Sequence, residues 1–285
     1  MKILLLSPWE NCWVKHMAKY FTAGGHEFDW CEKLPIEELT KYDAIISGWA
    51  DLGAEWLGSH PKLAAKYICF IRSYEFWHND MTAIDWTNFD HVFMVNWFIH
   101  RAMHLPNSSL IANATDLEEI PLKNRMPGHD VLILADVNFK KGIPLLLQIA
   151  MQMKDYTFNI YGNVTCKRTY NYIRHYGLKN VFIRGYTEDI NAVFDKHQYI
   201  LLTSPVEGNP NCVIEGMAAG LKPIVHRFVG SVDQFPDECF WDTIQDAVHL
   251  IRHHHYNSVE YRDWIVEHYD MWKVYKQIAT VLEAK

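Results

Sequence analysis

The sequence predicts an α/β protein built from two doubly wound, parallel-sheet domains in tandem. Short apolar runs typical of buried strands alternate with helical stretches over most of the 285 residues. Such alternation is typical of parallel sheets with helices on both faces. The pattern lapses once, in the polar stretch 117–130, which contains two prolines and a glycine, and then restarts. We therefore expect a first domain over 1–120, a linker over 121–130 and a second domain over 131–262.

The first domain is expected to begin with a buried strand, "KILLLS", followed by a helix that ends at Gly24-Gly25. The next strand is expected to start near Glu27. The remaining apolar runs of this domain that predict strands are 42–49, 66–76, 91–97 and 108–114.

The second domain repeats the alternation of strands and helices. Its expected strands are 130–136, 156–162, 180–186, 199–204 and 222–228. The stretches between them that predict helices are 143–153, 166–177, 188–197 and 210–220. The end of the chain has apolar positions at helical spacing, and we expect a terminal helix over 263–285.

Charge and composition exclude several classes of partner. The net charge is −7, and residues 1–120 account for it, with nine Lys/Arg against sixteen Asp/Glu. Nucleic acid and anionic membranes both require a basic surface, so nucleic acid is not expected as a partner and membrane association is at most peripheral. No apolar run could span a membrane or serve as a signal-peptide core. The six scattered cysteines form no CxxC pair, which indicates reduced thiols and a cytoplasmic location.

The segment "LLTSPVEGNPNCVIEGMAAGLKPIV" places a helix start at the ligand-binding edge of the second sheet. Ligands bind beyond the carboxyl ends of parallel strands, and Ser204 ends such a strand. Asn209 suits the N-cap position, and Pro210 suits the first helical position. The N–H groups of Asn211 and Cys212 would then be available to bind an anion, assisted by the helix dipole.

Two glutamates flank this predicted anion site. Glu207 precedes the helix, and Glu215 follows eight positions later within it. Carboxylates accept hydrogen bonds from sugar hydroxyls, whereas the helix start binds phosphate, so the pair indicates a nucleotide-sugar. Gly208 would let the backbone approach the ligand, and the small residues at 216 and 218–220 would let the helix lie close to its strand.

The string "EGNPNCVIEGMAAGLKPIV" resembles the E-x7-E segment of the retaining GT-B glycosyltransferases, the family 4-like or group 1 enzymes. "KKG" at 140–142 is similar to their lysine–glycine loop, and "NIYGNV" to a strand that ends in glycine, here Gly162. "LKNVFIRGYTEDINAVFDKHQYILLTS" and "LIANATDLEEI" resemble their next βαβ stretch and their inter-domain turn. The resemblance implies two Rossmann-like domains that face each other across a cleft, with a C-terminal helix that crosses back to the first domain.

The resemblance also implies roles for individual residues. Glu207 would hold donor-sugar hydroxyls, and Lys141 would neutralise the departing diphosphate, so both are predicted to be catalytic. Lys141 could instead be a solvated lysine beside Lys140. Glu215 would bind the ribose, and the residues around 184–186 would border the base. The further donor-side residues that the resemblance implies are Gly208, Asn209, Pro210, Asn211, Cys212, Gly162, Arg184 and Tyr186. The family needs no metal or cofactor, so none is expected.

Several positions depart from the family pattern. Asp136 stands where the family usually has a phosphate-binding arginine, and "WENCW" replaces the glycine-rich loop of the first domain. Arg72 falls where the family has a histidine near the donor sugar, with His78 close by. We predict that Arg72 supplies the missing phosphate cation as a third catalytic residue. It could instead simply pair with Glu75.

Aromatic residues concentrate in the first domain, which holds eight of the eleven tryptophans. Aromatic faces can stack on sugar rings, and an acidic, aromatic surface suits a neutral glycan acceptor. The predicted acceptor-side residues are Trp9, Trp13, Glu75, Trp77 and His78. The tract His253–His255 has the look of metal ligands, but we interpret it as a solvated loop without cysteine or acidic neighbours, and no metal site is predicted.

The sequence therefore predicts a metal-independent glycosyltransferase. It would move a sugar from a UDP- or GDP-sugar to a hydroxyl acceptor, a glycan or a small molecule, with retention of configuration. The alternative is a nucleotide- or glycan-binding pseudoenzyme, because Asp136 and "WENCW" depart from the family pattern. A nucleotide-dependent oxidoreductase is disfavoured because no GxGxxG follows a strand.

Overall fold

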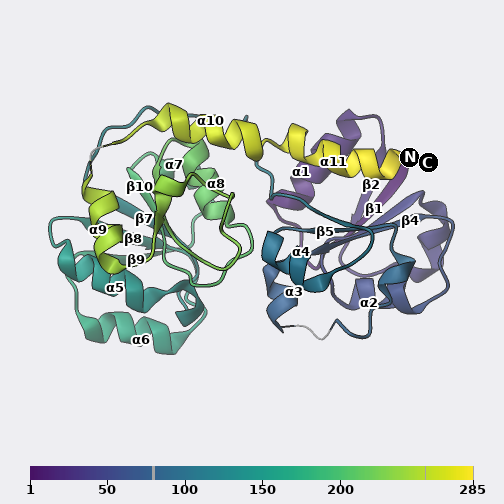
Figure 1. Ribbon diagram of the computed structural model, residues 1–285, viewed down its shortest axis with the longest axis horizontal. Helices are drawn as coiled ribbons and strands as arrows, with labels where there is room; N and C mark the ends of the chain where they lie inside the picture. The colour runs from purple at the N-terminus through teal and green to yellow at the C-terminus, as the bar shows by residue number, and fades with distance from the viewer. Residues whose placement is uncertain (79–80, 254, 285) are drawn as a thin grey trace. The chain divides into compact units, whose positions relative to one another are not determined.

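The chain forms two compact units, each built around its own six-stranded parallel sheet (Figure 1). The computed structural model describes residues 1–78, 81–253 and 255–284. Unit 1 comprises Met1–Asp116 together with Tyr269–Lys285, and unit 2 comprises Leu117–His268. The predicted fold class, two doubly wound domains, is confirmed.

The sheet of unit 1 has the strand order β2-β1-β3-β4-β5-β6, with every neighbouring pair parallel. Its strands are β1 (Lys2–Leu6), β2 (Glu27–Cys31), β3 (Ala44–Ser47), β4 (Lys66–Ile71), β5 (His91–Met94) and β6 (Ser108–Leu110). Its α-helices are α1 (Cys12–Ala23), α2 (Leu52–Ser59), α3 (Ser73–His78), α4 (Trp97–Met103) and α11 (Met271–Glu283). Its 3₁₀ turns are η1 (Ile36–Lys41) and η2 (Trp86–Asn88).

Two apolar cores cover the two faces of this sheet. One core joins the sheet to α1 and α11 through residues such as Phe21, Tyr275 and Ile278. The other joins it to α2 and α4 through residues such as Leu57 and Ile99. The C-terminal helix therefore returns to the first domain, as predicted. It is shorter than the expected 263–285, because Asp270 caps α11 by accepting from the N–H groups of Trp272 and Lys273.

Three of the strands expected in unit 1 are shorter than their apolar runs. The run 66–76 is a strand only to Ile71, because the chain then turns into α3. Likewise the run 91–97 ends as strand at Met94, because the Asn96 side chain accepts from the N–H of Phe98 and starts α4. The run 108–114 pairs with β5 only as far as Leu110. In the run 91–97, a polar capping side chain therefore ends the strand earlier than the apolar pattern indicates.

The sheet of unit 2 has the strand order β12-β11-β10-β7-β8-β9, again parallel throughout. Its strands are β7 (Asp130–Leu134), β8 (Thr157–Tyr161), β9 (Val181–Gly185), β10 (Tyr199–Leu202), β11 (Lys222–His226) and β12 (Phe240–Trp241). Its α-helices are α5 (Ile143–Gln152), α6 (Lys167–Tyr176), α7 (Ile190–Phe194), α8 (Asn211–Ala218), α9 (Ile244–Arg252) and α10 (Ser258–His268). Its 3₁₀ turns are η3 (Phe139–Lys141) and η4 (Asp237–Cys239).

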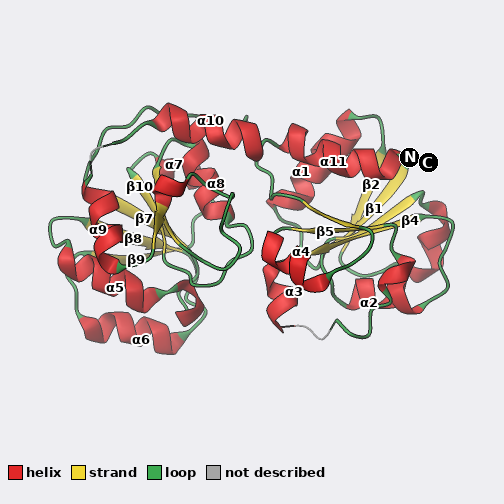
Figure 2. Ribbon diagram, viewed as in Figure 1, coloured by secondary structure: helices red, strands yellow, loops and turns green. Residues whose placement is uncertain are grey.

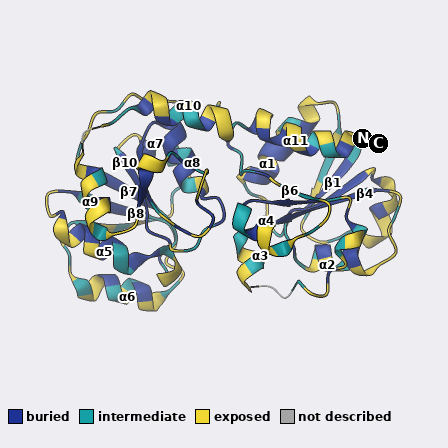
Figure 3. Ribbon diagram, viewed as in Figure 1, coloured by how far each residue is buried: buried dark blue, intermediate teal, exposed yellow. Residues whose placement is uncertain are grey.

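Helices cover both faces of this second sheet (Figure 2). A core of nineteen buried residues joins the sheet to α5, α6 and α9 on one face, with Leu146, Ile173 and Ile251 among them. On the other face α8 packs against β10 and β11, and α10 packs against α8. In Figure 3 the strands are largely buried, whereas the outward faces of α5, α6 and α9 are exposed. None of the helices in the described ranges is long and apolar enough to cross a membrane.

The polar segment that we expected to be a linker is held along unit 2 by arginine side chains. Arg125 donates to the carbonyl oxygens of His197 and Ala219 at 3.0 and 3.2 Å. Arg262, on α10, donates to the carbonyl oxygen of Ile120 at 2.6 Å. A Cβ on Gly220 would lie 2.5 Å from the carbonyl oxygen of Lys123, so glycine allows this close passage. The segment 117–130 is therefore part of the second unit's surface.

Candidate functional site

The carboxyl edge of the second sheet brings the ends of β7 and β10 beside the start of α8. These two strands are neighbours in the sheet, so the loops that follow them share one edge. α8 lies close to β10, because a Cβ on Gly216 would come within 2.9 Å of the Ile200 side chain. The small residues of α8 therefore have the packing role expected from the sequence.

Lys141 sits on a loop that is fixed tightly against the end of β10. The Asn138 side chain accepts from the N–H of Lys141 and caps the 3₁₀ turn. The hydroxyl of Thr203 donates to the carbonyl oxygen of Lys141 at 2.7 Å. Gly142 adopts a left-handed conformation, with φ +67°, and a Cβ there would lie 1.8 Å from the carbonyl oxygen of Thr203. Glycine is thus required for this loop to meet the strand end.

Lys141 and Glu207 form an ion pair, with 2.6 Å between Nζ and Oε1. The side chains are 27% and 14% exposed, respectively, so water screens the pair only partly. Burial alone would lower the pKa of Lys141, but the charge and hydrogen bond of Glu207 outweigh it, and the net shift is upward. Lys141 therefore stays cationic at neutral pH. The alternative of a solvated lysine is wrong.

Glu215 and Cys212 lie on α8 and are both half-buried. Burial raises the pKa of Glu215 to about 7, well above its usual 4.5. Burial, followed by the nearby Glu207 carboxylate, raises the pKa of the Cys212 thiol to about 12. The thiol is consequently protonated at neutral pH and is not a nucleophile.

The start of α8 differs from its expected geometry. Pro210 occupies the N-cap position, without a side-chain cap, and the helix begins at Asn211. The prediction that Asn209 is the N-cap is wrong, because its side-chain amide donates instead to Oε1 of Gln234 at 2.9 Å. Asn211 is exposed and Asn209 is 6% exposed.

Gln234 is a residue that the sequence analysis missed. It follows β11 and donates from Nε2 to the carbonyl oxygens of Gly208 and Gly230, both at 2.8 Å. It therefore links the loop after β10, which holds the predicted donor-side residues Gly208, Asn209 and Pro210, to the loop after β11. A single glutamine between strands carries no recognisable signal in the sequence.

Asp136 has a structural role where the resemblance led us to expect an arginine. Its carboxylate accepts from the N–H of Asn163 at 3.0 Å and so fixes the turn after β8. The same turn needs Gly162, because a Cβ there would lie 2.3 Å from the carbonyl oxygen of Ala135. Asp136 thus accepts from the backbone N–H of Asn163, which an arginine could not do because its side chain has no hydrogen-bond acceptor.

The two residues expected near the base lie at the end of β9. Arg184 donates from Nε to Oδ1 of Asn159 at 2.9 Å, and its guanidinium lies 4.7 Å from the centre of the Phe182 ring. The Tyr186 side chain is 68% exposed. Arg184 is therefore held along the sheet, whereas Tyr186 projects into solvent.

In unit 1, the Arg72 guanidinium packs against two tryptophan rings. It is 4.6 Å from the ring centre of Trp13 and 4.7 Å from that of Trp49. It donates to the carbonyl oxygen of Gly48 at 3.3 Å and to Oδ1 of Asn113 at 3.0 Å. Trp13 is buried, and a Cβ on Gly48 would lie 2.7 Å from its ring. Trp13 is thus a packing residue that holds Arg72.

The other predicted acceptor-side residues differ in exposure. Glu75 is 1% exposed, accepts from the backbone N–H of Arg72 at 3.2 Å, and has its pKa raised to about 7 by burial. Trp9 is exposed and packs on Trp49. Trp77 is exposed and stacks on Phe98, and His78 is exposed beside Tyr74. Only Trp9, Trp77 and His78 of this set offer an exposed ring.

A cavity of about 340 Å³ opens at the carboxyl edge of the sheet in unit 1. It lies between the end of β1, the segment after β2 and the start of α2. Its lining mixes apolar and charged side chains, among them Pro8, Lys33, Asp51, Leu52 and Trp56. None of the predicted acceptor-side residues lines it.

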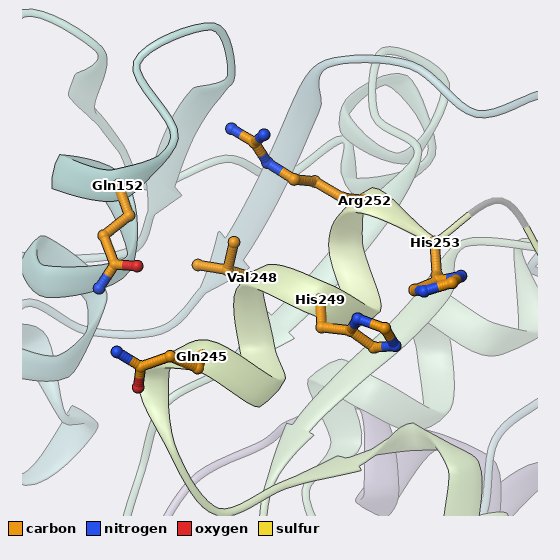
Figure 4. A pocket seen from close by; sticks show the side chains of 6 residues that line it. All are labelled: Gln152, Gln245, Val248, His249, Arg252 and His253. Carbon is orange, nitrogen blue, oxygen red and sulfur yellow. The ribbon is translucent and has the colours of Figure 1, made fainter.

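Two cavities of unit 2 lie away from Lys141 and Glu207. One, of about 470 Å³, lies between α5 and α9 (Figure 4). The other, of about 220 Å³, adjoins Lys222, the first residue of β11, and therefore the amino edge of the sheet. Its lining includes His253, His255, Cys239, Glu238 and Glu260. The statement that the histidine tract lacks cysteine and acidic neighbours is thus wrong, since His255 Nε2 lies 3.5 Å from Glu260 Oε2. His254 lies outside the described residues.

Comparison with known proteins identifies the fold. Residues 128–239 match the family described as glycosyl transferases group 1. Sucrose-phosphate synthase from Thermosynechococcus elongatus superposes with a TM-score of 0.77 at 13% identity, over 99% of this chain and 98% of that one. The chain has the GT-B fold. The resemblance to GT-B glycosyltransferases that we inferred from the sequence is confirmed.

Other solved structures share this architecture. HepE from Anabaena, solved in complex with UDP-glucose, gives a TM-score of 0.76 at 13% identity, with 99% of both chains covered. TarM gives 0.69 at 17% identity over 85% of this chain. The chain spans 55% of the length of TarM. No curated protein sequence matches the chain.

Proposed function

We propose that this GT-B protein transfers a sugar from a nucleoside-diphosphate sugar to a hydroxyl acceptor, with retention of configuration and without a metal. The observation that carries the proposal is the Lys141–Glu207 ion pair beside the start of α8, with Glu215 within the same helix. This arrangement combines a fixed cation, a helix start and two carboxylates. A diphosphate flanked by sugar hydroxyls is a ligand that uses all of these groups.

Each group then has a defined task in the reaction. The bond between the sugar C1 and the diphosphate oxygen breaks, and the acceptor oxygen forms a bond to C1 on the same face. The acceptor proton passes to the departing diphosphate. Lys141 and the N–H groups at the start of α8 stabilise the negative charge that develops on the diphosphate. Glu207 holds sugar hydroxyls, Glu215 holds the ribose, and the protonated Cys212 thiol takes no covalent part.

The donor that we propose is a UDP- or GDP-sugar. HepE was crystallised with UDP-glucose, and a TarM variant from S. aureus with UDP and a GlcNAc-glycerol, which supports a nucleotide-sugar for a protein of this fold. For the acceptor we propose a glycan or a small hydroxyl compound bound at the carboxyl edge of the sheet in unit 1. The 340 Å³ cavity and the exposed Trp9 offer an apolar wall and a stacking face there. The role of Arg72 as a phosphate cation stays a prediction.

A thermal-shift panel tests the donor site directly. The wild type is measured with UDP, GDP, ADP and CMP and with their common sugar conjugates, followed by a donor-hydrolysis assay with the nucleotide that binds. A ligand at about 100 times its Kd adds roughly 2.7 kcal/mol, enough to raise Tm by several degrees. A shift with one nucleoside diphosphate and release of sugar from its conjugate are expected. If no nucleotide raises Tm, the proposal is wrong.

A second candidate is a nucleotide-binding protein of the same fold without transferase activity. The observation that favours it is Asp136, whose carboxylate is engaged by the N–H of Asn163 at the position where the resemblance implies a phosphate-binding arginine. Such a protein would bind the nucleotide in the thermal-shift panel but release no sugar from any conjugate. The hydrolysis assay therefore separates the two candidates.

A further inference from the structure

The side-chain amide of Gln234 joins two loops at the carboxyl edge of the second sheet. Its two N–H groups are directed at two carbonyl oxygens, those of Gly208 and Gly230, and its oxygen accepts from Nδ2 of Asn209. All three distances lie between 2.8 and 2.9 Å. The amide therefore uses both of its donors and accepts one hydrogen bond in linking the loop after β10 to the loop after β11.

The loop that carries Gln234 is itself held firmly. Phe228 and Phe235, on either side of it, are 3% and 2% exposed, and the indole N–H of Trp264 donates to the Gln234 carbonyl oxygen at 3.2 Å. Gly230 and Asp233 adopt left-handed conformations, with φ +87° and +64°. A left-handed non-glycine residue is unfavourable by itself and persists where surrounding contacts fix it. Gln234 thus presents its amide from an anchored segment.

The anchored amide determines the orientation of one peptide group in the loop after β10. The peptide between Gly208 and Asn209 is planar and trans, since the described chain contains no cis peptide. Its carbonyl oxygen points at Gln234, so its N–H points the opposite way. The hydrogen bond from the Asn209 side chain to Gln234 gives this peptide group a second attachment to the amide.

We propose that Gln234 is a positioning residue, which holds the Gly208–Asn209 peptide in the orientation that the diphosphate of the donor requires. This inference rests on the proposed function, because it assigns the loop after β10 to the nucleoside-diphosphate sugar. Gln234 acts through Gly208 and Asn209 and need not contact the ligand. Without its amide, the loop after β10 loses two hydrogen bonds, those of Gly208 and Asn209, and the orientation of the peptide is no longer fixed.

The test uses two variants and a matched control. Gln234→Met keeps the length and packing of the side chain but removes its amide. Gln234→Glu keeps the acceptor for Asn209 but turns a carboxylate oxygen toward two carbonyl oxygens. Gln152→Ala changes an exposed glutamine at the end of α5, on the opposite edge of the sheet. Tm is recorded for all three variants, so that a folding defect is recognised.

Two measurements decide the proposal. The first is the affinity for the nucleoside diphosphate and for its parent nucleoside. Each lost hydrogen bond corresponds to roughly a 2- to 12-fold change, and two of the bonds reach the loop after β10. Gln234→Met should therefore weaken binding of the diphosphate by at least about 5-fold. The affinity for the nucleoside should fall much less, and both affinities of Gln152→Ala should match those of the wild type. The second is hydrogen exchange of residues 206–213 without nucleotide, which should be faster in both Gln234 variants.

The outcomes separate this inference from the proposed function. If exchange at 206–213 and the diphosphate affinity are both unchanged in Gln234→Met, the inference is overturned. Equal losses of affinity for the nucleoside and for the diphosphate would indicate a general structural role of Gln234 and would overturn the inference as well. If the wild type binds no nucleotide but exchange becomes faster in the variants, the proposed function fails while the link between the two loops stands.

Discussion

Replacing Glu215 by glutamine should stabilise the folded protein and weaken nucleotide binding at the same time. The side chain lies half-buried on α8, and burial raises its pKa from 4.5 to about 7. A pKa difference of one unit between the folded and unfolded chain corresponds to about 1.4 kcal/mol. The ionised carboxylate therefore destabilises the folded state by up to about 3 kcal/mol above pH 7. A neutral amide avoids this cost.

The expected effect of this substitution has a definite direction with pH. Because the pKa of Glu215 is higher in the folded state, the folded chain binds the proton more tightly. The stability that this proton contributes is fully present below about pH 4.5 and is lost as the pH rises through about 7. The gain from Glu215→Gln should thus be small near pH 4.5 and reach up to about 3 kcal/mol at pH 8, an increase in Tm of several degrees.

The assay is a series of Tm measurements between pH 5 and 8, with and without the nucleoside diphosphate. Nucleotide should raise Tm less in Glu215→Gln than in the wild type, because an amide oxygen accepts weaker hydrogen bonds from ribose hydroxyls than a carboxylate does. Glu188→Gln, at an exposed position of the same unit, serves as the control. A Glu215→Gln protein that is less stable than the wild type at pH 8 would refute the reasoning, as would a Tm difference that does not depend on pH.

Three further predictions concern the same edge of the sheet. Gly142→Ala should destabilise the protein by more than about 1 kcal/mol and abolish nucleotide binding, because the added Cβ would lie 1.8 Å from the carbonyl oxygen of Thr203. Calorimetry measures the stability, and a binding assay measures the affinity for the nucleotide. Lys141→Met should lower the transfer rate about 100- to 1,000-fold while nucleotide still binds; a rate within threefold of the wild type would contradict its role. Iodoacetamide at pH 8 should label Cys166 before Cys212, and mass spectrometry shows the order of labelling. The reason is that hydrogen bonds from Thr169 lower the pKa of Cys166, whereas burial raises the pKa of Cys212 to about 12.

The alternation of apolar runs was sufficient to predict the fold, but it did not locate where each element ends. Strand β4 and helix α3 lie within one apolar run, and nothing in its hydrophobicity marks the change at Ser73. The terminal helix was predicted as continuous, whereas Asp270 starts a new helix within it. The boundary at Asp270 depends on a single polar side chain that caps the backbone, and a periodicity averaged over many residues does not detect it.

The candidate site was predictable where it depends on neighbours along the chain. The strand end, the glycine of the lysine loop and the two glutamates around the start of α8 all belong to short motifs. Gln234 was missed because its partners lie 25 and 26 residues earlier in the chain. The resemblance revealed Asp136 as a departure, but its cause, a hydrogen bond to the N–H of Asn163, depends on how two loops meet. Contacts between loops need the sheet order, which the sequence did not supply.

The two glutamates at α8 differ in a way that restricts the ligand. Glu207 is compensated by Lys141, so a bound phosphate would share that cation and leave Glu207 to accept from hydroxyls. The side-chain carboxylate of Glu215 has no hydrogen-bond partner within residues 1–78, 81–253 and 255–284, and burial makes its charge unfavourable. A second phosphate beside it would add repulsion, whereas neutral hydroxyl groups would supply the missing donors. The electrostatics of the site therefore favour a ligand with one anionic centre between two hydroxyl-bearing rings over a more highly charged polyphosphate.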